Sequence, residues 1–185
     1  MPSAPFQTIM VAIDSTEVSD KAFEKAVAMA EALDAKLLII HVLNVRDADH
    51  PRPIHSYSTP GTIVIDEAIH QQYQQAWNAY VEHYEALLKQ KIEEAQSKGV
   101  EAESMQPHGA TGRVLCKTAR TFGADLLIVG SHQRRGISEL MMGSTSNYIM
   151  HHAPCSVLVV HPHVAPMTTL EYPHISSASK EMVSV

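Results

Sequence analysis

Four short apolar runs constrain the fold of this chain more than any other feature. Residues 8–13, 37–42, 125–129 and 156–160 are rich in Val, Ile and Leu and show no regular polar alternation. Such runs are typical of strands that are buried on both faces of a parallel sheet. Residues 100–106 alternate weakly and are predicted to form an edge strand.

Helical periodicity fills most of the sequence between these runs. Apolar residues recur there at intervals of three and four, which predicts amphipathic helices. The predicted helices cover 19–33, 66–98, 111–122 and a segment that starts at 139 or 143 and ends at 152. Ser19 is predicted to cap the first helix, with Asp20 favourable to its dipole. The alternation predicts the α/β class: an open parallel sheet with helices on both faces.

The length of 185 residues indicates one domain, and two segments do not follow its alternation of strands and helices. Residues 46–65 hold most of the turn-forming residues before the long helix and predict an inserted loop or lid. From residue 162 the composition shifts toward Pro, Ser and Thr, so 162–185 is predicted to be a flexible tail or an arm on a partner. The domain itself is expected to comprise residues 1–161.

The charge balance argues against two classes of partner. Fourteen Lys and Arg residues against 20 Asp and Glu residues give a net charge of −6, without a basic run. Binding to nucleic acid or to a membrane surface is therefore not expected. No apolar run approaches the roughly 20 residues of a membrane span, and residues 1–6 do not resemble the start of a signal peptide. Cys116 and Cys155 are too few for a disulfide framework, which predicts reduced thiols and a cytoplasmic location.

Polar residues and glycines follow the carboxyl ends of the predicted strands, where open parallel sheets bind their ligands. Asp14 and Ser15 follow the first strand. The segment Gly130-Ser131-His132-Gln133-Arg134-Arg135-Gly136 follows another strand, and Gly143-Ser144-Thr145 opens a helix. Amides at a helix start, two hydroxyls and two arginines suit a phosphate group. A plain strand-to-helix connection, with glycines that only turn the chain, fits the spacing equally well.

The same segment carries a resemblance to a known family. Gly130, the nine residues after Gln133, and Gly143-Ser144 follow the signature G-x-x-G-x9-G-[ST], with glutamine in place of the second glycine. The sequences at 8–15, 39–42 and 154–160 match the surroundings of that signature. The chain resembles a single-domain universal stress protein over about residues 5–161, apart from the insertion.

The resemblance implies a Rossmann-like sheet of order 3-2-1-4-5 and an adenine nucleotide, namely ATP, ADP, AMP or cyclic AMP, with or without Mg²⁺. It places Asp14 near the ribose, Ala12 and Val42 at the adenine, and the start of the last helix at the phosphates. The full set of implied contacts is Ala12, Ile13, Asp14, Ser15, Val42, Val129, Gly130, His132, Gln133, Arg135, Gly143, Ser144 and Thr145. It also implies a homodimer formed through the strand 156–160.

Gln133 departs from the signature and leaves the nucleotide open. Its side chain either clashes with the outer phosphates or donates a hydrogen bond to one of them from its amide. The clash favours AMP, a cyclic nucleotide or ADP over ATP. The leading hypothesis is a nucleotide-binding stress or signalling protein whose occupancy biases partner interactions. The alternative is a dimeric interaction module, with an unknown protein partner, that no longer binds nucleotide. Slow ATP hydrolysis ranks last, because no Gly-Lys-Ser/Thr sequence and no evident catalytic base occur.

Other residues have both a structural and a functional interpretation. Asp14 is either a ribose acceptor or a turn residue, and His132 is either a phosphate contact or a solvated loop residue. Near the C-terminus the potential metal ligands follow no zinc spacing, so no metal site is predicted; they are His151, His152, Cys155, His161 and His163. The aromatic stripe Tyr73, Trp77, Tyr80 and Tyr84 is predicted to pack on the sheet or on a partner.

Overall fold

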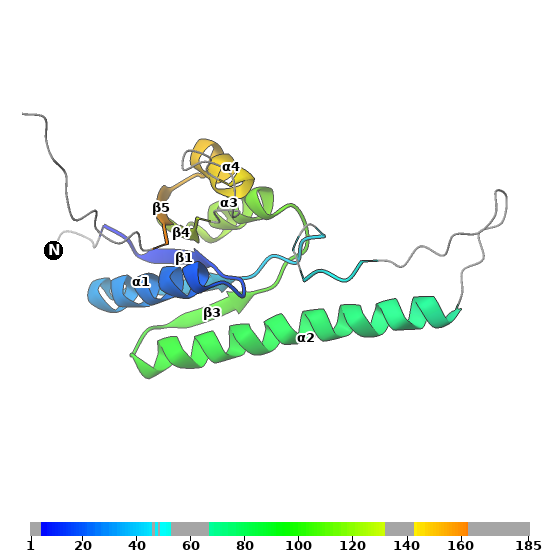
Figure 1. Ribbon diagram of the computed structural model, residues 1–185. Coiled ribbons are helices and arrows are strands. Elements are labelled where there is room, and N and C mark those ends of the chain that lie inside the picture. The colour runs from blue at the N-terminus through cyan, green and yellow to red at the C-terminus, as the bar shows by residue number, and fades with distance from the viewer. Residues whose placement is uncertain (1–4, 46, 48, 53–66, 132–142, 163–185) are drawn as a thin grey trace, which may run out of the picture.

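The computed structural model in Figure 1 describes residues 5–45, 47, 49–52, 67–131 and 143–162. Within these residues, five parallel strands form one sheet in the order β3-β2-β1-β4-β5. The strands are β1 (Thr8–Ala12), β2 (Lys36–Ile40), β3 (Ala102–Met105), β4 (Leu126–Gly130) and β5 (Ser156–Val160). The helices are α1 (Glu17–Leu33), α2 (Glu67–Ser97), α3 (Thr111–Phe122) and α4 (Ser144–His152). The predicted α/β class and the strand order are confirmed.

The centre of the sheet is β1, which pairs in parallel with β2 on one side and with β4 on the other. Its residues Ile9, Met10 and Val11 are fully buried. Successive side chains of a strand point to opposite faces, so an uninterrupted apolar strand fills the layers above and below it. The chain builds outward from β1 to β3 and then returns to β4 beside β1, which makes the β1–β4 boundary the switch point of the sheet.

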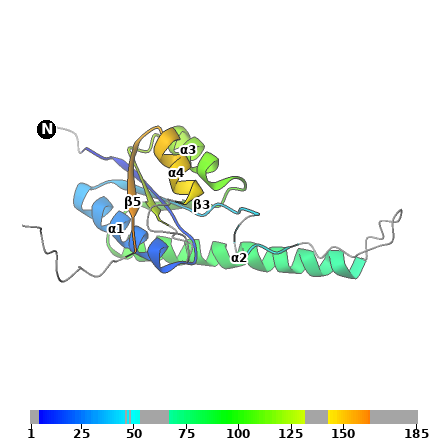
Figure 2. The same ribbon diagram turned by 45° about the horizontal axis from the view of Figure 1, so that its top comes forward.

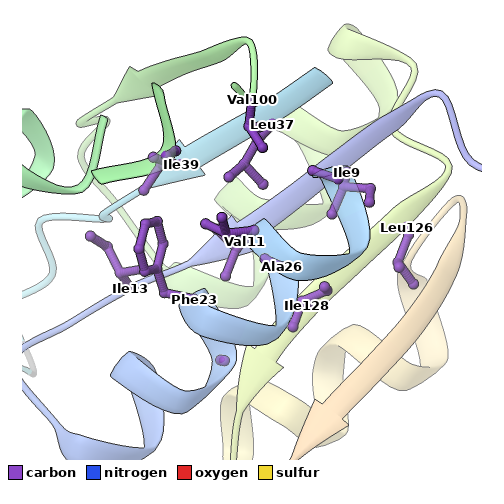
Figure 3. Packing of buried hydrophobic residues seen from close by; sticks show 14 of the residues in the cluster. Ile9, Val11, Ile13, Phe23, Ala26, Leu37, Ile39, Val100, Leu126 and Ile128 are labelled. Atoms are coloured by element: carbon purple, nitrogen blue, oxygen red, sulfur yellow. The ribbon is translucent and has the colours of Figure 1, made fainter. Parts of the chain in front are cut away.

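Helices cover both faces of the sheet, with α1 and α2 on one face and α3 and α4 on the other (Figures 1 and 2). Figure 3 shows Phe23 and Ala26 of α1 lying over Ile9, Val11 and Ile128 of the two central strands. The neighbouring strand positions face the other way, into a second core beneath α3 and α4. The two cores fix the sheet between its helices.

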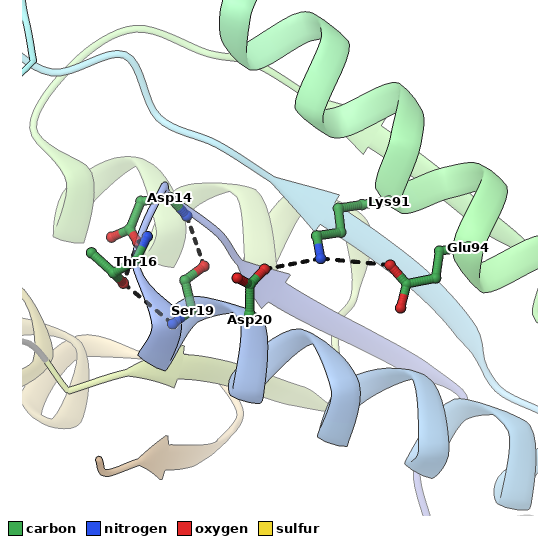
Figure 4. A network of polar contacts seen from close by, with 6 residues as sticks. All are labelled: Asp14, Thr16, Ser19, Asp20, Lys91 and Glu94. Carbon is green, nitrogen blue, oxygen red and sulfur yellow. Dashed lines mark hydrogen bonds and ion pairs between the residues drawn. The ribbon is translucent and has the colours of Figure 1, made fainter.

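The start of α1 corrects the predicted cap. Thr16 is the N-cap, and its Oγ1 accepts a hydrogen bond from the Ser19 N–H at 3.3 Å. Ser19 lies inside the first turn, where its buried Oγ accepts from the Asp14 N–H at 2.8 Å (Figure 4). Thr16 is the cap because the Asp14 carboxylate accepts from its N–H and its hydroxyl, at 2.9 and 2.6 Å, and so holds it in the extended conformation that a cap requires.

The long helix α2 packs against the sheet through the part that begins at Tyr80. Its buried side chains are Tyr80, Tyr84, Leu88, Lys91 and Ala95. The part before Tyr80 extends past the sheet (Figures 1 and 2). Lys91 links α2 to α1, because its ammonium lies 2.9 Å from Asp20 (Figure 4). The same ammonium lies 4.6 Å from the centroid of the Phe23 ring.

Some predicted boundaries fall at or beyond the edge of the described residues. The last helix begins at Ser144 with Gly143 as its N-cap, one residue after the later of its two predicted starts. The predicted insertion 46–65 is described only at 47 and 49–52, and the predicted tail only at Pro162. The lid and the flexible tail therefore stay predictions.

Candidate functional site

The carboxyl ends of β1, β2 and β4 lie side by side at the switch point. The register pairs Ala12 with Ile40 and Val11 with Ile128. The pairing of β1 with β2 continues one residue further, because the Ile13 N–H donates to the Ile40 carbonyl at 2.9 Å. The residues that leave these strands meet at one edge of the sheet, which is where ligands bind in open α/β sheets.

Three of the predicted nucleoside contacts lie on one face of this edge. Val42 and Val129 are buried in the core beneath α3 and α4, and the half-buried Ala12 packs against that core. The structure thus brings together three side chains that the resemblance places around the nucleoside, two of them at the adenine. Their role in binding stays a prediction.

Asp14 lies two residues after Ala12 and has the turn role that the sequence left as an alternative. Its Oδ1 accepts from the Thr16 N–H at 2.9 Å and from the Thr16 hydroxyl at 2.6 Å. These bonds fix the carboxylate at the start of the turn. The ribose role of Asp14 stays a prediction.

The two neighbours of Asp14 contact residues on the α1 and α2 side of the sheet. Ile13 is buried in the core beneath α1, and its carbonyl lies 2.9 Å from the His41 Nδ1. Ser15 is exposed, and its Oγ lies 3.3 Å from the hydroxyl of Tyr84 in α2. Their contacts to a nucleotide stay predictions.

Gly130 has a packing role at the end of β4. A Cβ at this position would lie 3.1 Å from Val18 Cγ1 and 3.5 Å from the Ser19 amide nitrogen. Glycine thus lets the first turn of α1 approach the end of β4 closely. The next residue, Ser131, is buried, and its N–H donates to the Val160 carbonyl at 2.8 Å.

The start of α4 offers backbone donors for an anion. Gly143 is the N-cap and supplies no side chain to occupy the first amides, while Ser144 is exposed and Thr145 is half-buried. The unpaired amides of a first helical turn favour negative charge. Close packing against α3 holds α4 in place, because a Cβ on Gly112 would lie 2.8 Å from Tyr148 Cδ1.

The remaining predicted phosphate contacts lie outside the described residues. They are His132, Gln133 and Arg135, together with Arg134. The consequence of Gln133 for the outer phosphates therefore stays a prediction.

Sequence reasoning missed a buried pair beneath Asp14. His41 is 3% exposed and stacks on Tyr84, with ring centroids 3.5 Å apart and planes 5° apart. Burial lowers the pKa of His41 and raises the pKa of the Tyr84 hydroxyl. The available signals in the sequence were a histidine inside an apolar run, His41, and a tyrosine at a helical interval from other aromatic residues, Tyr84. Neither signal shows that the two rings contact each other.

The described residues hold neither a metal-binding cluster nor a membrane-spanning helix. No group of three or more potential ligands (His, Cys, Asp or Glu) is arranged to hold a metal ion there. His163, one of the C-terminal candidates, lies outside the described part of the chain. None of the described helices is both long and apolar enough to cross a membrane.

The family assignment agrees with the fold. A profile of the universal stress protein family matches residues 5–161. The chain belongs to the universal stress protein family. The universal stress protein YxiE of Bacillus subtilis is 30% identical over 155 residues, which cover 84% of this chain and 99% of YxiE.

Solved structures of universal stress proteins share the fold. One, in complex with cAMP, has a TM-score of 0.58 at 24% identity, over 85% of this chain and 98% of that chain. A family protein from Arabidopsis thaliana with AMP bound has a TM-score of 0.55 at 20% identity, over 85% of this chain and 92% of that chain. Identities this low show a common fold, and the two nucleotides are properties of those proteins.

Proposed function

We propose that this universal stress protein binds an adenine nucleotide at the switch point of its sheet, and that occupancy biases its interactions with partner proteins. The observation that carries the proposal is that Ala12, Val42 and Val129 converge on one face of the sheet at the switch point, with Asp14 two residues after Ala12. Apolar side chains line the site of a base, and a carboxylate beside them accepts from the ribose hydroxyls. The first amides of α4 favour the charge of a phosphate.

The nucleotide we favour carries few phosphates. Gln133 stands where the signature has a glycine, and a side chain there opposes a bare backbone approach to the outer phosphates. The family structures with AMP and with cAMP support the same class of ligand. AMP or cyclic AMP is therefore the first candidate, followed by ADP and then by ATP with or without Mg²⁺.

The interaction-module alternative is favoured by the outer edge of the sheet. β5 is the last strand in the sheet order, and its Val157, Leu158 and Val159 are only half-buried. An edge strand with apolar side chains can pair with a second copy. We propose a homodimer through β5 under either hypothesis. We also propose a cytoplasmic location, which the unpaired thiols of Cys116 and Cys155 support.

The experiment is a calorimetric titration of the purified protein with AMP, cyclic AMP, ADP and ATP, after any co-purified nucleotide has been identified. The Asp14→Asn substitution keeps an oxygen for the turn but removes the charge, and we expect about tenfold weaker binding. Gly143→Glu places a negative charge at the first amides of α4 and should also weaken AMP binding. Asp34→Asn at the end of α1 and Asn147→Glu in α4 are the matched controls. If the unmodified protein binds none of the four nucleotides, the interaction module replaces this proposal.

A further inference from the structure

The underside of the Asp14 turn rests on the His41 and Tyr84 pair. A carbonyl can only accept a hydrogen bond, so the His41 Nδ1 at 2.9 Å from the Ile13 carbonyl is the donor. The lowered pKa of His41 agrees with a neutral ring in that tautomer. The flat stack of Tyr84 on this ring therefore fixes, through His41, the backbone on one side of Asp14.

The hydroxyl of Tyr84 reaches the other side of Asp14. It donates to Asp49 Oδ2 at 2.6 Å and lies 3.3 Å from Ser15 Oγ. A phenol has one hydroxyl proton, and Tyr84 donates it in the hydrogen bond to Asp49. The Ser15 hydroxyl is therefore placed to donate to the phenol oxygen. Tyr84 thus holds both neighbours of Asp14, one by stacking through His41 and one by its hydroxyl.

The same helix holds three residues that follow β2. These are Asp47, Asp49 and His50, hereafter the latch. One turn before Tyr84, the Tyr80 hydroxyl donates to Asp47 Oδ2 at 3.1 Å. His50 is buried and meets the rings of Trp77 and Tyr80 edge-on, with centroids 5.3 and 5.5 Å away.

The network links the proposed ribose contact to a natural reporter. Trp77 is the single tryptophan of the chain, and its ring lies against His50 of the latch and, at 5.6 Å, against His108. Tyr84 is the residue that touches both ends, because its hydroxyl meets Ser15 beside Asp14 and Asp49 in the latch. The Tyr84 ring also meets the Tyr80 ring edge-on at 5.3 Å, and the Tyr80 ring lies 5.7 Å from Trp77. The Tyr84 hydroxyl is thus a hydrogen-bonded link between the turn and the latch.

We propose that Tyr84 is a positioning residue that couples the turn around Asp14 to the latch. This inference rests on the proposed function for its ligand. Binding and latch formation then support each other by the same factor, because coupling between two sites is reciprocal. A nucleotide that orders the turn strengthens the latch and alters the Trp77 environment, and a broken latch weakens nucleotide binding.

The test uses the full chain and the Tyr84→Phe substitution, which keeps the ring on His41 and removes the hydroxyl. AMP is titrated by calorimetry while tryptophan emission is followed. In the unmodified protein we expect the emission to change along the binding curve. In Tyr84→Phe we expect about five- to tenfold weaker binding and loss of the emission change. Tyr73→Phe is the matched control: the same change on the same helix, outside this network.

A second substitution and a ligand-free measurement complete the test. Asp49→Ala removes the acceptor at an exposed position, and combining it with Tyr84→Phe should add little beyond either change alone. Hydrogen exchange without nucleotide should be faster at residues 14–16 in Tyr84→Phe but not in Tyr73→Phe. If exchange there is unchanged, or if Tyr84→Phe binds AMP with native affinity and a native emission change, the positioning role is overturned. If the unmodified protein binds no nucleotide, the proposed function fails, and the exchange result alone decides whether Tyr84 holds the turn.

Discussion

The side chains on the two faces of the sheet differ in chemistry at the carboxyl ends of the strands. On the α3 and α4 face, Ala12, Val42 and Val129 belong to the apolar core. On the α1 and α2 face, His41 and Tyr84 form a stacked and hydrogen-bonded group. Apolar contact depends on area and has no direction, whereas a hydrogen bond requires a defined distance and angle. The apolar face thus packs through contact area, and the hydrogen-bonded face fixes the geometry of the turn around Asp14.

The largest expected effect tests the core that supports the hydrogen-bonded face. Phe23 is fully buried between α1 and the sheet, and Phe23→Ala should lower the free energy of unfolding by about 3–5 kcal/mol. Phe122→Ala is the control, because Phe122 is 39% exposed, and it should cost under about 1 kcal/mol. Urea denaturation measures both. Equal losses would contradict the packing described for α1.

The next effect concerns the close approach of α1 to β4. Gly130→Ala places a Cβ 3.1 Å from Val18 Cγ1 and pushes on the first turn of α1, which should cost about 1–3 kcal/mol of stability. Nucleotide affinity should fall as well, because Ser19 of that turn accepts a hydrogen bond from the Asp14 N–H. Gly99→Ala is the comparison: its surroundings are open and its φ is +79°, so it should cost about 1 kcal/mol by backbone strain. An equal fall in affinity in Gly99→Ala would show that the approach at Gly130 is not what matters.

The pH dependence of stability distinguishes the two faces by their titrating groups. The pKa of His41 is lowered in the folded protein by burial, against the attraction of Asp47, Asp14 and Asp49. Below about pH 6.5 the unfolded chain therefore binds more protons at this site, and stability falls as the pH drops, by up to about 1.4 kcal/mol per pH unit. The raised pKa of Asp47 acts in the opposite direction, in the range where carboxyl groups titrate.

Urea denaturation of the unmodified protein and of His41→Asn at about pH 5 to 8, the range in which histidine titrates, measures the slope of the free energy of unfolding against pH. The substitution should reduce the slope, and His70→Gln, at an exposed position of α2, should leave it unchanged. An unchanged slope in His41→Asn would mean that the buried ring does not carry the pH dependence.

The smallest expected effect concerns the ion pairs of Lys91. Lys91→Met keeps the apolar stem near Phe23 but loses the contacts to Asp20 at 2.9 Å and Glu94 at 3.5 Å. Asp20 is 55% exposed, so solvent screens its pair, and the loss should be under about 1 kcal/mol. Lys91→Ala should cost more because it also removes the stem. Thermal denaturation curves of both variants in low and high salt would separate the contribution of charge from that of packing. A larger loss of stability in Lys91→Met than in Lys91→Ala would contradict this ranking.

Much of the fold was predictable because buried strands and amphipathic helices leave local patterns. The apolar runs predicted β1, β2, β4 and β5, and parallel strand ends must meet at one edge of the sheet. The grouping of Ala12, Val42 and Val129 came from the family resemblance. The helix start was less certain, because Asp14, Ser15, Thr16 and Ser19 are all residue types that occur at caps. Only the hydrogen bonds of Asp14 decide that Thr16 is the cap.

The hydrogen-bonded face was not predictable in the same way. The spacing of Tyr80 and Tyr84 indicates that they share a helix face, but not how far α2 lies along the sheet. The contacts of Tyr84 to Ser15 and Asp49 span 69 and 35 residues of sequence. Such pairs depend on tertiary packing, and no local pattern in one sequence specifies them.

A crystal structure of this chain grown with AMP tests the central claim most directly. The account predicts the adenine against Ala12, Val42 and Val129, with a ribose hydroxyl about 3 Å from the Asp14 carboxylate. It also predicts that the Tyr84 hydroxyl keeps its contacts to Ser15 and Asp49. AMP bound elsewhere on the chain, or an empty switch point at saturating AMP, would contradict it.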